Sequence, residues 1–166
     1  SNNKHAVYKY TYADGSYTQS TVAGTRSDNG PELNQLYNPT GIHVDDSGNV
    51  YVADTENQRI VKWAPNAVVG EVVAGGNGQG NALNQLYNPK GLTVDGSGNV
   101  YVADWDNSRI VKWAVGANEG VNMYGYQRPF DLEFDALGNL YSADYGTHSV
   151  KKFSPGASSG VVIAGT

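Results

Sequence analysis

The sequence predicts an all-β fold of stacked four-stranded sheets, and an internal repeat is the main observation behind this prediction. Residues 33–64 match residues 83–114 at a shift of 50, with identity at 25 of 32 positions. A third copy follows at a shift of 40, where residues 135–152 keep the pattern of residues 95–112. Turn residues divide each copy into short strand-like segments without a helical period. The chain is therefore expected to repeat one four-stranded unit.

The first copy shows the expected order of strands in each unit. We expect strand a at residues 41–44, strand b at 50–53, strand c at 59–63 and strand d at 71–74. Strands a and b are joined by the turn Asp-Asp-Ser-Gly-Asn, in which Gly48 adopts a positive φ at little cost. Strand b is apolar on both faces, which predicts that other sheets cover each sheet from both sides. Sheets stacked in this way radiate like the blades of a propeller.

The N-terminal segment fits the second half of the same unit. Residues 6–10 resemble strand c and residues 20–24 resemble strand d, which brings the expected total to fourteen strands. We therefore expect one propeller domain. Its expected parts are an incomplete blade at residues 1–32, blade 1 at 33–82, blade 2 at 83–122 and blade 3 at 123–166.

The repeat resembles the NHL-repeat family. The first two copies read Pro-x-Gly, then Val-Asp-x-x-Gly-Asn-Val-Tyr-Val-Ala-Asp, then Asn-x-Arg-Ile-Val-Lys-Trp, and Ala-Gly closes strand d at residues 74–75 and 164–165. The third copy departs from this pattern, with Asp131 for the glycine, Ser142 for a valine, and Thr147 and Ser149 for the Asn and Arg. Members of the family are usually six-bladed rings. The resemblance implies a β-propeller arc of about three and a half four-stranded blades, half of such a ring.

Composition excludes several classes of function. The chain has 11 Lys and Arg against 16 Asp and Glu, and a net charge of −5 gives little attraction for nucleic acid. No run approaches the roughly 20 apolar residues of a membrane helix, so we expect no membrane insertion. The richness in Gly, Asn, Ser and Tyr favours a secreted or cell-surface protein, although Asn38-Pro-Thr is blocked as a glycosylation site by proline.

An arc of blades leaves an apolar face open at each end, which implies a partner. Two copies that meet head to tail would close a ring, and a contact that fails to close would propagate as a filament. The alternative is that blades of a longer chain cover these faces. Both alternatives remain open at the level of the sequence.

Repeated polar residues after strand b are interpreted as structural. Asp and Asn side chains satisfy loop amides and Asp pairs with Arg, which explains their recurrence in successive blades. This set comprises Asp54, Asn57, Arg59, Asp104, Asn107, Arg109 and Asp144. From Asp45 onward, residues with oxygen-bearing side chains follow the spacing of ligands in a calcium-binding loop. Val50 stands where that loop requires glycine, so we expect no metal site. The three histidines are isolated from one another in the sequence, and the chain has no phosphate-binding motif. We therefore expect no cofactor and no catalytic residues.

Variable loop residues point to binding, because residues that change while the scaffold repeats are not required by the fold. The loops after strand b and before strand a emerge on one side of the ring. The candidate ligand-binding residues on them are Thr55, Trp105, Tyr145, Asn38, Asn88, Tyr126 and Arg128. Trp and Tyr on loops suit sugars or peptide side chains, although they can also simply pack on neighbouring loops.

Three hypotheses for function follow. The first is a non-catalytic module that recognises a protein or a glycan and self-assembles through its open blade ends. The second is a structural subunit of a ring or filament. The third is a fragment of a propeller enzyme of the lyase or lactonase kind, which would require further blades.

Overall fold

The computed structural model describes residues 5–25, 28–125 and 128–165, and this part of the chain is all-β apart from one short 3-10 turn. It forms one two-stranded sheet and three four-stranded sheets. We call these the half-blade, blade 1, blade 2 and blade 3. The half-blade contains β1 (His5–Ala13) and β2 (Ser16–Thr25); blade 1 contains β3 (Pro39–Val44), β4 (Val50–Asp54), β5 (Arg59–Trp63) and β6 (Glu71–Gly75), with the 3-10 turn Thr55–Asn57. Blade 2 contains β7 (Pro89–Val94), β8 (Val100–Asp104), β9 (Arg109–Trp113) and β10 (Val121–Gly125); blade 3 contains β11 (Pro129–Phe134), β12 (Leu140–Asp144), β13 (Ser149–Phe153) and β14 (Val161–Gly165).

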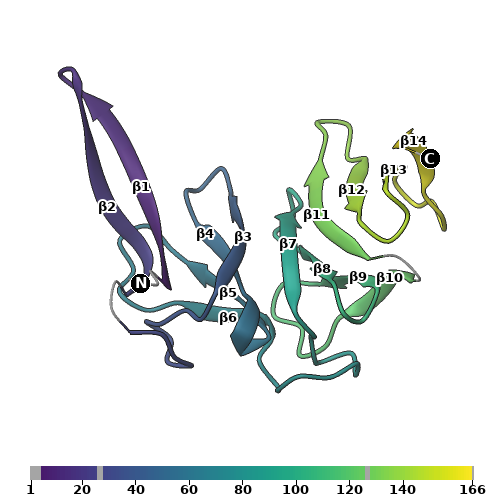
Figure 1. Cartoon of the computed structure of the whole chain (residues 1–166), viewed down its shortest axis with the longest axis horizontal. Coiled ribbons are helices and arrows are strands. Elements are labelled where there is room, and N and C mark those ends of the chain that lie inside the picture. Colours follow the sequence, from purple (N-terminus) through teal and green to yellow (C-terminus); the bar gives the residue numbers. More distant parts are fainter. Residues whose placement is uncertain (1–4, 26–27, 126–127, 166) are drawn as a thin grey trace.

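Each blade is an antiparallel meander in chain order, and the blades follow one another along an arc (Figure 1). The first strands of the blades, β3, β7 and β11, contact one another in succession. The half-blade lies at one end of the arc and β14 at the other. The all-β arc of four-stranded blades expected from the sequence is therefore confirmed.

Apolar layers between neighbouring blades form the core. Val52, Val61 and Trp63 pack toward the half-blade, and the equivalent residues of blade 2 pack toward blade 1. Tyr101, Tyr124 and Phe153 belong to the layer between blades 2 and 3. Strand b is buried from end to end in blade 2, which explains why its sequence has no polar face.

The half-blade differs from the short strands expected at residues 6–10 and 20–24. Its two strands are 9 and 10 residues long and form a continuous hairpin that projects from the arc (Figure 1). A tight turn at Asp14 and Gly15, with φ of 50° and 80°, joins them and matches the twist of a two-residue hairpin. Tyr12 faces Tyr17 across the ladder, with ring centroids 4.9 Å apart. Because this hairpin has no counterpart in the other repeats, the repeat could not predict its length.

Blade 1 keeps an uncovered patch beside the half-blade. Ile42 and Val44 on β3 are 55% and 57% exposed, whereas the equivalent Leu92 and Val94 of blade 2 are 2% and 9% exposed. The first two strands of the preceding blade cover β7, but the half-blade has no such strands beside β3. The patch therefore follows directly from the missing pair of strands.

Candidate binding site at the loops of blades 2 and 3

A repeated Asp–Arg pair holds the loop that leads into each of the first two blades. We call residues 28–38 and 78–88 the leading loops. The Nε of Arg59 donates to Oδ2 of Asp54 at 2.7 Å, and its Nη atoms donate to three carbonyl oxygens of the first leading loop. Arg109 makes the same bonds to Asp104 and to the second leading loop.

Further bonds complete this arrangement and leave the carboxylates fully occupied. The Nδ2 of Asn57 and of Asn107 each donate to the neighbouring Asp and to a carbonyl oxygen of the leading loop. Burial raises the pKa of Asp104, although its hydrogen bonds and the Arg109 charge act in the opposite direction. Since every oxygen of the pair points into the scaffold, the pair braces the loops and offers nothing to a substrate.

The strongest cluster of candidate binding residues lies where blade 2 meets blade 3. The indole of Trp105 contacts Phe130 edge-on, with ring centroids 5.4 Å apart, and contacts Tyr145 at 5.2 Å. The ring of Tyr145 lies 5.9 Å from that of His148. The guanidinium of Arg128 lies over the indole at 5.3 Å, within the range of a cation–π contact. We call Trp105, Arg128, Phe130, Tyr145 and His148 the aromatic cluster.

A carboxylate joins the aromatic cluster to the second leading loop. Asp106 pairs with Arg128 at 3.5 Å and accepts a hydrogen bond from Nδ2 of Asn88 at 2.8 Å. The backbone amide of Asn88 in turn donates to Oε1 of Gln58 in blade 1. Three predicted candidates, Trp105, Tyr145 and Arg128, are therefore in direct contact, and Asn88 reaches them through Asp106.

The aromatic cluster combines exposed rings with groups that form hydrogen bonds. Tyr145 is 59% exposed and Phe130 is 52% exposed, so much of each side chain is accessible to solvent. Half-exposed aromatic rings beside a cation and a carboxylate stack on apolar faces of a ligand and fix its polar groups. Sugars and peptide side chains both present such faces.

The remaining candidates lie elsewhere. Thr55 is only 1% exposed, and its hydroxyl donates to the carbonyl oxygen of Pro89 at 2.8 Å, so the expectation that it belongs to an exposed binding face is corrected. Blade 2 covers this position in blade 1. Asn38 is exposed at the opposite end of the arc, where its amide donates to Nδ1 of His5. Tyr126 lies outside the described residues.

Two members of the aromatic cluster were not among the predicted binding residues. Phe130 occupies the position of Thr40 and Lys90 in the other repeats, so the same variability that singled out the loops also marks it. His148 has a positive φ of 52°, like Gln58 and Ser108 at the same place in the repeat. The sequence did not predict its contact with Tyr145, because that contact depends on the conformation of the turn between β12 and β13.

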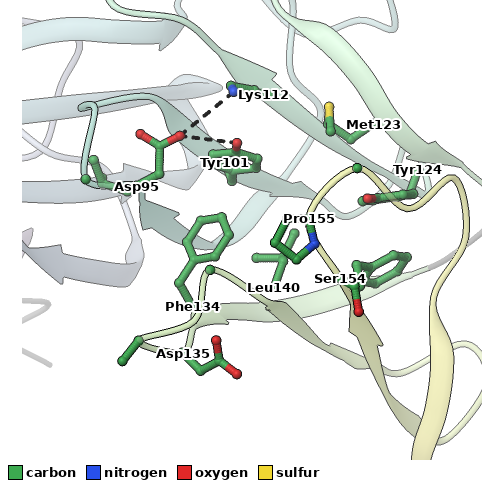
Figure 2. Close-up of a pocket in the computed structure, with 16 residues that line it drawn as sticks. Asp95, Tyr101, Lys112, Met123, Tyr124, Phe134, Asp135, Leu140, Ser154 and Pro155 are labelled. Atoms are coloured by element: carbon green, nitrogen blue, oxygen red, sulfur yellow. Dashed lines mark hydrogen bonds and ion pairs between the residues drawn. The ribbon is translucent and has the colours of Figure 1, made fainter.

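A hollow of about 570 Å³ lies between blades 2 and 3, at the ends of their strands opposite to the aromatic cluster (Figure 2). Tyr101, Phe134 and Leu140 line it. Asp95 on its rim accepts a hydrogen bond from Tyr101 at 3.3 Å and pairs with Lys112 at 3.8 Å. The Asp–Tyr bond recurs in all three blades, which assigns these polar groups to the turn between strands a and b.

The described residues contain no group of three His, Cys, Asp or Glu side chains arranged to hold a metal ion. Within the same residues, no helix is long and apolar enough to cross a membrane. Neither observation adds a function to the aromatic cluster.

Comparisons with known proteins identify the repeat and the fold. The NHL repeat model matches residues 36–63 and 86–113. No curated protein matches the chain.

Among solved structures, a nidogen/laminin complex aligns with a TM-score of 0.65 and 23% identity over 89% of this chain and 51% of that chain. Virginiamycin B lyase from Staphylococcus aureus aligns with a TM-score of 0.57 and 16% identity over 79% of this chain and 42% of that one. A streptogramin B lyase gives 0.56 and 13%, over 89% and 43%. The chain thus spans about half the length of these structures. It carries NHL repeats and belongs to the β-propeller fold.

Proposed function

We propose that this chain is a non-catalytic recognition module that binds a protein or a glycan through the aromatic cluster. The observation that carries the proposal is the contact of Trp105 with Tyr145 and Arg128 on an exposed surface between two blades. A scaffold that repeats nearly unchanged presents different residues at this junction, as binding surfaces on rigid folds do. The nidogen/laminin likeness, at 23% identity, concerns the fold alone, so a protein ligand and a secreted or cell-surface location are parts of the proposal.

A binding screen with a truncated cluster tests this function. The chain is immobilised and exposed to a glycan array and to laminin, and every ligand found is measured again with Trp105→Ala. We expect at least a tenfold loss of affinity, because the indole holds the other rings and Arg128 in place. Tyr17→Ala is the matched control, since Tyr17 is exposed but lies on the projecting hairpin. Equal binding by the Trp105 variant would reject the site.

Self-assembly through the open ends of the arc is a second candidate function. The exposed side chains of Ile42 and Val44 at one end, and of Ile163 on the edge strand β14 at the other, favour it. Light scattering over a range of concentrations measures it directly. A mass above 17.7 kDa that falls with Ile42→Lys would support assembly, and a constant monomer would reject it.

The alternative of a propeller-enzyme fragment rests on the likeness to two lyases, which at 16% and 13% identity concerns the fold alone. The described residues contain no group of three His, Cys, Asp or Glu side chains that could hold a metal ion, as the metal and histidine clusters of propeller enzymes would require. We therefore propose no catalytic role.

A further inference from the structure

The hollow between blades 2 and 3 is larger than its counterpart between blades 1 and 2. Both occupy the same place in the repeat, since Tyr101 and Lys112 in the first correspond to Tyr51 and Lys62 in the second. Their volumes are about 570 Å³ and about 240 Å³. The larger volume is within the range of pockets that bind small molecules, and the smaller one is below that range.

Two pairs of aromatic rings line the larger hollow, and each pair has one ring from each blade. Tyr101 contacts Phe134 edge-on, with ring centroids 4.9 Å apart (Figure 2). Tyr124 stacks on Phe153, with centroids 4.0 Å apart. The thioether of Met123 belongs to the same lining. Aromatic rings and a thioether suit contact with the flat apolar face of a ligand.

Some of these walls are particular to the junction of blades 2 and 3. Phe134 stands at the repeat position of Val94, and Met123 stands at that of Val73. Both replacements bring a longer side chain, yet the hollow between these blades stays the larger of the two. An apolar surface that is enlarged but left open between rigid elements is typical of a ligand pocket.

The charged side chains that line the hollow sum to one negative charge. They are the carboxylates of Asp95 and Asp135 and the ammonium of Lys112. Lys112 pairs with Asp95 at 3.8 Å, whereas no Lys, Arg or His nitrogen of the described residues lies within 4.0 Å of the Asp135 carboxylate. The side chain of Asn139, with further hydrogen bonds in the turn, lowers the pKa of Asp135 to about 2, so this carboxylate is charged at neutral pH. The rim therefore favours a cation.

We propose that this hollow binds a small molecule that combines a flat aromatic body with a protonated amine. The aromatic body lies against Phe134 and Met123, and the amine lies at the rim beside Asp135. The hollow is at the ends of the strands opposite to the aromatic cluster, so it is a second site. The proposal goes beyond the function proposed above and does not depend on it.

Two probes that share one indole-ethyl body test the proposal. Tryptamine carries an amine on this body, and indolepropionate carries a carboxylate. Calorimetric titration of the full chain should show saturable binding of tryptamine at one site, and indolepropionate should bind at least about tenfold more weakly. The backbone amide signals of Gly96 and Asp135 should shift during the tryptamine titration followed by NMR. No saturable binding of tryptamine, or equal binding of the two probes, would overturn the proposal.

Gly96 allows a charge to be placed at the rim without disturbing the packing. It lines the hollow, nothing lies within 4 Å of a Cβ atom built on it, and the equivalent residue of blade 1 is Asp46. Gly96→Lys should weaken tryptamine binding at least about threefold, whereas Gly96→Asp should not weaken it.

Asp46→Lys is the matched control for Gly96→Lys. It places the same side chain in the same turn of blade 1, outside the lining of the hollow, and changes the net charge of the chain by more. Tryptamine binding should be unchanged in this variant. Equal affinity in Gly96→Lys and the native chain, or an equal loss in Asp46→Lys, would count against the site.

Phe134→Val tests the aromatic wall separately from the charge. It introduces the residue that blade 2 has at the same position, so the blade is expected to fold. Affinity for tryptamine should fall about threefold or more, because one aromatic face is lost. Far-UV circular dichroism and the urea midpoint report the fold of the variant. Native affinity in a folded Phe134→Val chain would overturn the proposal, and the Gly96 variants decide it if this chain does not fold.

Trp105→Ala separates the hollow from the aromatic cluster. This variant should keep its affinity for tryptamine while it loses recognition of a glycan or protein. Gly96→Lys should show the reverse pattern. Loss of tryptamine binding in Trp105→Ala would place the amine at the aromatic cluster and overturn the second site. Failure of one site would thus leave the other standing.

Discussion

Lys151 takes over in blade 3 the charge that Arg59 and Arg109 supply in the other blades: its Nζ lies 3.0 Å from Oδ2 of Asp144. Ser149 stands at the position of the arginines, and Lys151 is two residues further along the same face of β13. The longer leading loop is absent before blade 3, so a guanidinium would find none of the carbonyl oxygens that Arg109 binds. A simple ammonium is sufficient to neutralise the buried carboxylate.

Removing this ammonium should destabilise blade 3. Asp144 is buried, and Lys151→Met would leave its carboxylate without a cation, at a cost of about 3 kcal/mol in the free energy of unfolding. Urea denaturation measures this cost. Lys152→Met is the control, because Lys152 lies 5.7 Å from the centre of the Tyr141 ring and should contribute less than about 1 kcal/mol. Equal losses in the two variants would contradict the assignment.

The same pair sets a pH dependence. Burial acts to raise the pKa of Asp144, but the hydrogen bond and charge of Lys151 and two backbone amides outweigh it, and the pKa is lowered. A carboxylate with a lowered pKa stabilises the fold above its unfolded pKa, and this contribution is lost as the pH falls through the folded value. Denaturation curves at pH 6 and pH 3 should therefore differ less in Lys151→Met than in the native chain. An unchanged difference would mean that other groups govern acid stability.

Asp135 offers a sharper measurement in the turn before β12. The side chain of Asn139, followed by its backbone amide and by Tyr141, lowers the pKa of Asp135 to about 2. Its ionised form should thus favour folding above pH 4, and the benefit should disappear as the pH falls toward 2. NMR titration of the Asp135 carboxyl should show its pKa move upward toward 3.8 in Asn139→Ala. No movement would show that the backbone amides and Tyr141 stabilise the charge without the Asn139 side chain.

Much of the fold could be read from the repeat, because period-two apolar patterns and turn residues determine the strands locally. Strand c was expected at residues 59–63, the bounds of β5, and strand b at residues 50–53 lies within β4. The aromatic cluster could be predicted only in part from the sequence. Thr55 is buried against blade 2, where its hydroxyl donates to the carbonyl oxygen of Pro89. The ring of Phe130 in blade 3 contacts the indole of Trp105 in blade 2. Such contacts depend on how blades stack, which one repeat does not reveal.

Gly91 on β7 of blade 2 leads to a further prediction. A Cβ atom on Gly91 would lie 2.6 Å from Cα of Asp131, because β7 and β11 approach backbone to backbone. Gly91→Ala should therefore cost about 1–3 kcal/mol through overpacking. Asp131 stands at the equivalent position of blade 3 and is exposed, so Asp131→Ala should change the free energy of unfolding by less than about 0.5 kcal/mol. Urea denaturation of both variants decides the matter.

The uncovered patch of blade 1 provides the last prediction, since two equivalent side chains meet different neighbours. Leu92 is buried beneath the strands of blade 1, and Leu92→Ala should cost about 2–5 kcal/mol from lost burial and the cavity left behind. Ile42 is 55% exposed on β3, so Ile42→Ala should cost about 1 kcal/mol or less. Urea unfolding of the two variants in the same buffer compares them directly. A large loss at Ile42 would mean that another surface covers this patch in solution, and light scattering of the same sample would then show whether a second copy supplies it.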